Sequence, residues 1–148
     1  MPSQNRQIVQ KLFNDLFNKG NLAVADQIIA PNHVNHDPAT PYFGKGPDGE
    51  KQIVTLYRGA FPDLHFTIDQ IIDAGDFLAV RYTATGTHKA ALRGVAPTNK
   101  TVKVGGEAIY RISRGKIVES WVYWDALGLM QQLGAVPALE IVKAQAAK

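Results

Sequence analysis

The chain has 148 residues, of which 45% are hydrophobic and 20% are charged, so residues 1–148 are predicted to form a single globular domain. It contains no cysteine, which excludes disulfides, thiolate zinc sites and cysteine nucleophiles. The net charge is +3, but the 16 Lys and Arg residues are scattered along the chain, which does not favour a nucleic-acid partner.

The N-terminal half predicts helices. Residues 4–19 place an apolar residue every three or four positions, and this stripe contains Ile8, Val9, Leu12, Phe13, Leu16 and Phe17. Further helices are expected over 22–30 and 48–61. The segment between them, 31–47, is rich in proline and has no periodicity, so it is predicted to be a loop.

The C-terminal half predicts strands, because the apolar period becomes two from Leu64 onward. Strands are expected from 64 to a turn at 74–76, over 77–89, over 101–113 with a bulge or bend at Gly105-Gly106, and over 116–125. Short helices are expected over 126–133 and 137–148. Helices grouped before an antiparallel sheet indicate the α+β class.

A two-residue turn at Arg114-Gly115 would fix the pairing of the last two strands. Directly opposed residues share a face, so the face expected to lie under the helices carries Ala108, Tyr110, Ile112, Ile117, Glu119, Trp121, Tyr123 and Asp125. The opposite face carries Ile109, Arg111, Val118, Ser120, Val122 and Trp124. Because this second face is also apolar, a homodimer through the outer side of the sheet is expected.

Two carboxylates stand out on the first face. Asp125 ends an aromatic strand and precedes a short helix, so it is either the N-cap of that helix or a general base whose pKa is raised by apolar surroundings. Glu119 either pairs with a neighbouring hydroxyl or cation or has a catalytic role.

The histidines leave several alternatives open. His33, His36 and Asp37 could hold a metal, form a turn, or line the mouth of a pocket with His36 turned inward. His88 either continues the buried face of the strand over 77–89 or lies in a loop. No third metal ligand stands out apart from His88, so no metal site is predicted. No phosphate-binding loop, nucleophile elbow or dinucleotide fingerprint is present, so no cofactor is predicted.

Three stretches together resemble a known family. "NKGNLAVADQIIAPNHVNHDP", "FPDLHFTIDQIIDAGDFLAVRYTATGTH" and "GKIVESWVYWDALGLMQQLG" are similar to the SnoaL-like polyketide cyclase (ester cyclase) branch of the NTF2-like superfamily. The resemblance implies a cone-shaped α+β fold, with a curved antiparallel sheet wrapped round three helices, an internal pocket, and usually a dimer. It also implies an intramolecular aldol ring closure of a polyketide methyl ester without metal or cofactor, in which Asp125 takes the acid/base position.

The prediction is therefore a cytoplasmic, cofactor-independent enzyme that acts on a small hydrophobic carbonyl or ester compound, with no nucleic-acid or membrane partner. Asp125 is the expected acid/base, and His36, His88 and Glu119 are the expected polar helpers. The residues expected to line the substrate pocket are Phe61, Tyr82, Tyr110, Trp121 and Tyr123. The alternative is a non-catalytic module that uses the same pocket to bind a ligand or a protein.

Overall fold

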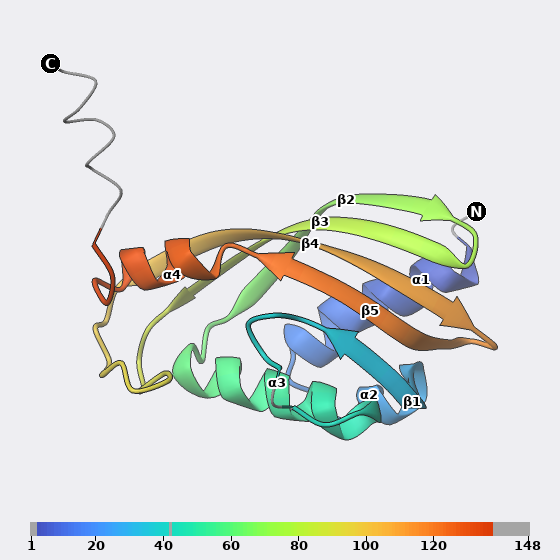
Figure 1. Cartoon of the computed structure of the whole chain (residues 1–148), viewed down its shortest axis with the longest axis horizontal. Helices are drawn as coiled ribbons and strands as arrows, with labels where there is room; N and C mark the ends of the chain where they lie inside the picture. The colour runs from blue at the N-terminus through green and yellow to red at the C-terminus, as the bar shows by residue number, and fades with distance from the viewer. Residues whose placement is uncertain (1–2, 42, 138–148) are drawn as a thin grey trace, which may run out of the picture.

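A computed structural model describes residues 3–41 and 43–137 of the chain and shows one curved sheet with helices on one side (Figure 1). The sheet has five strands in the order β1-β5-β4-β3-β2. Its strands are β1 (Ile29–His36), β2 (His65–Ala74), β3 (Phe77–Thr87), β4 (Thr101–Ser113) and β5 (Lys116–Trp124). The helices are α1 (Gln4–Lys11), η1 (Leu12–Phe17), α2 (Ala23–Ile28), α3 (Gly46–Ala60) and α4 (Ala126–Gln132). The predicted α+β class is confirmed.

The helical layer begins with the apolar stripe predicted from the sequence. Ser3 caps α1 by accepting a hydrogen bond from the Arg6 backbone N–H at 3.0 Å. After Lys11 the helix widens into the π-helix η1, which ends at Phe17. Apolar side chains of α1 and η1 then bury themselves against the inner face of β3 and β4, where they form the main core.

The first strand was not predicted. β1 takes up the end of the helix expected over 22–30, which stops at Ile28, and the beginning of the loop expected over 31–47. This strand pairs in parallel with β5, so that Asn35 lies opposite Ser120 and His36 opposite Trp121. Its inward side chains include His33 and Asn35, and these are polar where a half-buried strand is usually apolar. The alternation of apolar and polar residues that identifies a strand is therefore missing.

The β4–β5 hairpin corrects the predicted faces of β5. Its turn is confirmed: Arg114 and Gly115 both have positive φ, and Ser113 pairs with Lys116. Beyond Ile112–Ile117, however, a bulge at Val118 shifts the register, so Tyr110 pairs with Ser120 instead of Glu119. One extra residue turns every later side chain to the other face of the strand. At the Gly105-Gly106 pair, where a bulge or bend had been expected, the register is continuous, so no bulge is present there.

The short helix predicted over 126–133 is confirmed, because α4 follows β5 directly. The helix expected over 137–148 falls almost wholly outside the described residues. Within residues 3–41 and 43–137, none of the helices combines the length and the apolar character that crossing a membrane would require.

Candidate functional site

A cavity of about 100 Å³ lies between the inner face of the sheet and the helices. Most of its wall is aromatic or aliphatic and comes from η1, α3, α4 and the strands β2 to β5. The aromatic lining residues are Phe13, Phe17, Tyr57, Phe61, Phe66, Tyr82, Tyr110 and Trp124. A wall of this kind suits an apolar or aromatic small molecule.

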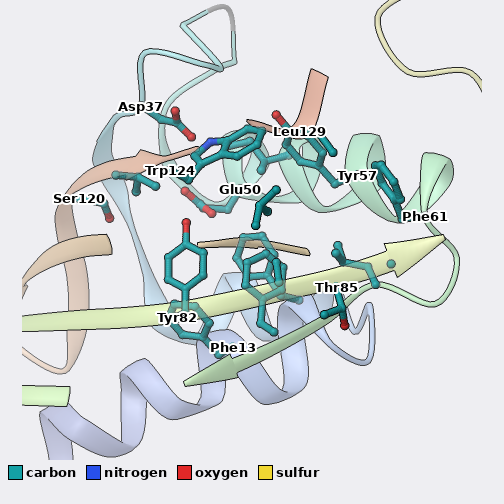
Figure 2. Close-up of a pocket in the computed structure, with 18 of the residues that line it drawn as sticks. Phe13, Asp37, Glu50, Tyr57, Phe61, Tyr82, Thr85, Ser120, Trp124 and Leu129 are labelled. Atoms are coloured by element: carbon teal, nitrogen blue, oxygen red, sulfur yellow. The ribbon is translucent and has the colours of Figure 1, made fainter. Parts of the chain in front are cut away.

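Polar groups gather at one side of the cavity (Figure 2). Asp37, Glu50 and Ser120 lie there beside Trp124, whereas Phe61 and Thr85 lie at the other side. Asn35 donates a hydrogen bond from Nδ2 to Oε1 of Glu50 at 3.2 Å. These groups come from three elements that are distant in the sequence: β1 and the residue after it, α3, and β5.

The two carboxyl groups of the cavity have perturbed pKa values. Burial raises the pKa of Glu50 from 4.5 to about 7, and the nearby charge of Asp37 acts in the same direction. Burial also raises the pKa of Asp37, although the hydrogen bond that its carboxylate accepts from the Ala39 backbone N–H at 2.8 Å and the charge of Arg93 oppose this. Near neutral pH, Glu50 is therefore divided between its acid and its base form.

The three tyrosines of the wall remain protonated. Burial raises the pKa of Tyr57 to about 12 and that of Tyr82 and Tyr110 further above the usual range. The Tyr82 ring has room to lie against β4 because residue 106 is glycine: a Cβ there would stand 2.4 Å from Tyr82 Oη. The tyrosines thus offer hydroxyl groups, not phenolates, to a bound molecule.

The profile of the SnoaL-like polyketide cyclase family matches residues 7–133, which is most of the chain. This range includes every residue that lines the cavity. The chain belongs to this family.

Individual relatives agree with this assignment. The nogalonic acid methyl ester cyclase of Streptomyces nogalater is 30% identical over 123 residues, which cover 80% of this SnoaL-like chain and 89% of the relative. The crystal structure of a candidate polyketide cyclase from Acidithiobacillus ferrooxidans is 31% identical, with a TM-score of 0.81 and coverage of 91% and 97% of the two chains. TsrD from Streptomyces laurentii, 24% identical with a TM-score of 0.81 and coverage of 90% and 96%, shows the same fold.

Three of the predicted pocket residues of this SnoaL-like protein do line the cavity: Phe61, Tyr82 and Tyr110. The other two, Trp121 and Tyr123, lie on the outer face of the sheet, where Tyr123 is 64% exposed. Their predicted location is wrong because the bulge at Val118 was not foreseen. A role in substrate binding stays a prediction for the three residues inside.

Asp125 does not lie in the pocket, where the general-base alternative would have placed it. It is exposed, does not line the cavity, and caps α4 by accepting a hydrogen bond at Oδ1 from the Gly128 N–H at 2.8 Å. The capping alternative is therefore confirmed. The acid/base role of Asp125 stays a prediction that its position outside the cavity does not support.

His36 and Glu119 meet on the outer face instead of inside the pocket. Nε2 of His36 lies 2.7 Å from Oε2 of Glu119, and the His36 ring stacks on Trp121. Arg111 Nη2 lies 3.2 Å from Oε1 of the same carboxylate. Both hydrogen bonds lower the pKa of Glu119, and the one with His36 has the larger effect. The paired, structural alternative for Glu119 is the one that the structure supports.

β3 ends at Thr87, so His88 begins the connection that follows, as the loop alternative has it, but its side chain is fully buried. It does not line the cavity. Its Nδ1 accepts a hydrogen bond from the Thr98 backbone N–H at 3.2 Å, and its ring lies 5.4 Å from that of Phe61. His88 thus supports a wall residue from behind and anchors the connection between β3 and β4.

The suggested metal ligands are separated by the strand that holds them. His33 faces inward and His36 outward, since alternate residues of β1 point to opposite faces. In the described ranges, no three His, Cys, Asp or Glu side chains come together as metal ligands would.

Sequence reasoning missed Asn35, Asp37, Glu50, Ser120 and Trp124 as cavity residues. A usable signal existed for Glu50, because it precedes Ile53, Val54 and Tyr57 by three, four and seven positions and so lies on the buried side of the predicted helix. The inward direction of Ser120 had no such signal, because it depends on the bulge.

Proposed function

We propose that this SnoaL-like protein is a cofactor-independent acid/base enzyme acting on a small, largely apolar carbonyl or ester compound. The observation that supports this is a buried carboxyl group, Glu50, with a pKa of about 7 in a cavity walled by aromatic side chains. A general base is most effective when its pKa lies near the working pH. Glu50, not Asp125, is therefore the proposed base.

The proposed reaction is a ring closure, which the word cyclase in the names of the relatives describes, and we propose that it is of the aldol type. The Glu50 carboxylate removes a proton from the carbon next to a carbonyl. The C–H electron pair forms a C=C bond, and the carbonyl π pair moves to the oxygen, which gives an enolate. The enolate carbon attacks a second carbonyl of the same molecule and forms the new C–C bond. The resulting alkoxide takes the proton back from Glu50, so no oxidant, reductant or cofactor is consumed.

Asp37 and the tyrosines have supporting roles in this proposal. The charge of Asp37 helps to raise the pKa of Glu50, which strengthens Glu50 as a base once it is ionised. Tyr82 and Tyr110 keep their protons and can donate hydrogen bonds inside the cavity. Because the wall is largely apolar, such hydrogen bonds are stronger than they would be in solution.

The test uses a probe ketone, so that the natural substrate need not be known. Acetophenone is incubated with the protein in deuterated buffer, and exchange of its methyl protons is followed by NMR. We expect the wild-type protein to accelerate exchange, with a rate that rises with pH and levels off above about 7 as Glu50 ionises. Glu50→Gln should slow exchange by about a hundredfold or more, the usual contribution of a general base.

Asp125→Asn is the matched control for this test. It should exchange acetophenone at the wild-type rate, because its side chain lies outside the cavity lining. Loss of exchange in Asp125→Asn with retention in Glu50→Gln would instead assign the base to Asp125. Binding of acetophenone without any accelerated exchange would favour the non-catalytic ligand-binding module.

We also propose that two copies associate through the outer face of the sheet. Its exposed apolar residues include Phe77, Ile109 and Tyr123, at 45%, 46% and 64% exposure. Arg111 and Glu119 lie beside them with opposite charges. A twofold dimer brings the same patch of each copy together, so an apolar centre with charges of both signs at its edge can match itself.

A further inference from the structure

The cavity holds a hydroxyl group that the proposed reaction has not yet used. Ser120 lines the cavity, and its Oγ lies 2.8 Å from Nε2 of His33. Both residues are almost completely buried, with exposures of 2% and 1%. They belong to the adjacent strands β5 and β1, and the bulge at Val118 is what turns Ser120 inward.

The direction of this hydrogen bond decides what Ser120 can do. If His33 carries its proton on Nδ1, Ser120 donates to Nε2 and presents only lone pairs to the cavity. If His33 carries its proton on Nε2, that N–H donates to Ser120 Oγ and the Ser120 O–H is free to donate into the cavity. The first arrangement resembles an activated serine nucleophile, whereas the second makes Ser120 a hydrogen-bond donor.

The surroundings of His33 weigh against the nucleophile. Burial lowers the pKa of His33 from 6.5 to about 4, so the imidazole is neutral near pH 7 and its protonated form is strongly disfavoured. A histidine that activates a serine must accept the serine proton. A histidine that only orients a hydroxyl needs no change of charge, so burial is compatible with either neutral tautomer. Of the two, the tautomer with the proton on Nε2 is the one that leaves the Ser120 O–H free for the cavity.

We propose that Ser120 donates a hydrogen bond to the carbonyl oxygen of the bound substrate, and that neutral His33 positions its hydroxyl by donating from Nε2 to Oγ. This rests on the proposed function, since negative charge develops on that oxygen when Glu50 removes the neighbouring proton. The hydroxyl proton stays on Ser120 throughout. Ser120 is thus the proposed catalytic donor and His33 a positioning residue.

The first experiment reads the hydrogen bond directly. Acetophenone labelled with ¹³C at the carbonyl is bound to the protein, and donation to its oxygen moves the carbonyl signal downfield. We expect this shift in the wild-type protein and its loss in Ser120→Ala. The matched control is Thr85→Val, which removes a hydroxyl from the other side of the cavity and should keep the shift.

Affinity provides a second readout. α-Methylstyrene has nearly the shape of acetophenone but lacks the oxygen. The preference of the wild-type protein for acetophenone over α-methylstyrene should fall about threefold to tenfold in Ser120→Ala, the usual contribution of one hydrogen bond. An unchanged preference and an unchanged carbonyl signal in Ser120→Ala would overturn the proposal.

The role of His33 is tested on the unliganded protein by ¹⁵N NMR of its ring. The proposal requires a proton on Nε2 and none on Nδ1, and the opposite tautomer would overturn it whether or not acetophenone binds. His33→Gln keeps an N–H near the Nε2 position and should retain the carbonyl shift, whereas His33→Leu should reduce it. The tautomer measurement needs no variant, so it decides even if His33→Leu fails to fold.

The outcomes for Glu50 and Ser120 are separable. If acetophenone shows the carbonyl shift but no accelerated exchange, the donor site stands and Glu50 is not the base. If exchange depends on Glu50 but Ser120→Ala changes neither the rate nor the carbonyl signal, the proposed function stands and the donor assignment fails. If both hold, Ser120→Ala should slow exchange by about a hundredfold, as for the loss of an oxyanion donor.

Discussion

Glu50 and His33 are ionisable side chains whose charged forms are both opposed by the apolar interior. The pKa of Glu50 rises from 4.5 to about 7, and that of His33 falls from 6.5 to about 4. Burial therefore favours the neutral form of each, the protonated acid of Glu50 below about pH 7 and the unprotonated imidazole of His33 above about pH 4. Their effects on stability consequently have opposite signs over nearly the same pH range.

The signs follow from proton binding in the folded and unfolded states. Between pH 4.5 and 7 the folded protein holds a proton on Glu50 that the unfolded chain has released, so stability from Glu50 is complete below 4.5 and is lost as pH rises to about 7. Between pH 6.5 and 4 the unfolded chain binds a proton on His33 that the folded protein does not. Stability from His33 is thus complete above 6.5 and is lost as pH falls to about 4.

We therefore predict that the wild-type free energy of unfolding changes less between pH 4.5 and 6.5 than that of either single variant. In Glu50→Gln it should rise with pH by up to about 3 kcal/mol, because the His33 contribution is no longer offset by that of Glu50 and is opposed only by that of Asp37. In His33→Gln it should fall by up to about 3 kcal/mol, and the raised pKa of Asp37 should add to this fall. Urea unfolding at several pH values measures both slopes, and parallel curves for the two variants would contradict the prediction.

At the scale of one element, α4 depends on its cap. The Asp125 carboxylate packs against the backbone of Gly128, so closely that a Cβ on residue 128 would lie 2.1 Å from Oδ2 of Asp125. We predict that Asp125→Ala lowers the free energy of unfolding by about 1 kcal/mol, the usual effect of losing an N-cap. Asp125→Asn is the control, because it keeps an oxygen acceptor and should unfold close to wild type. Equal stability of all three proteins by thermal unfolding would refute the cap.

The strand β4 supplies a second test at this scale. A Cβ on Gly106 would lie 2.4 Å from Tyr82 Oη and 2.8 Å from the Cβ of Trp124, both of which line the cavity. Gly106→Ala should therefore destabilise the protein by roughly 1–3 kcal/mol through overpacking and should change the near-ultraviolet circular dichroism of these rings. Gly105→Ala, whose Cβ would come no closer than 3.9 Å to Tyr82, is the matched control. Similar losses in both variants would point to strand propensity instead.

At the scale of the whole molecule, the outer face of the sheet leads to a prediction about assembly. If two copies meet there, Trp121→Arg should convert a dimer into a monomer, because it places two cations in an apolar interface. Leu127→Arg, which changes an exposed apolar residue of α4 at 49% exposure, should leave the dimer intact. Sedimentation velocity over a range of concentrations distinguishes the two. A wild-type protein that stays monomeric at high concentration would remove the proposed dimer.

Much of the architecture could be predicted from the sequence because its signals are local. The stripe through Leu12 and Leu16 specifies the first helical segment, and the turn at Arg114-Gly115 specifies the last hairpin. Local chemistry also placed Asp125 before α4 as a possible cap. Each of these features depends on residues a few positions apart in the chain, which interact whatever the rest of the fold does.

The candidate site was predicted only in part, because its polar side depends on contacts between distant segments. Glu50, Ser120 and His33 meet only when α3 and β1 are placed against β5, and the inward direction of Ser120 depends on one extra residue at Val118. A bulge leaves no periodic trace, yet it reverses every side chain beyond it. The sequence alone thus determined the class of fold, its helices and its hairpins. Only the tertiary structure decided which face of β5 meets the cavity, since pairing register is a property of two strands together.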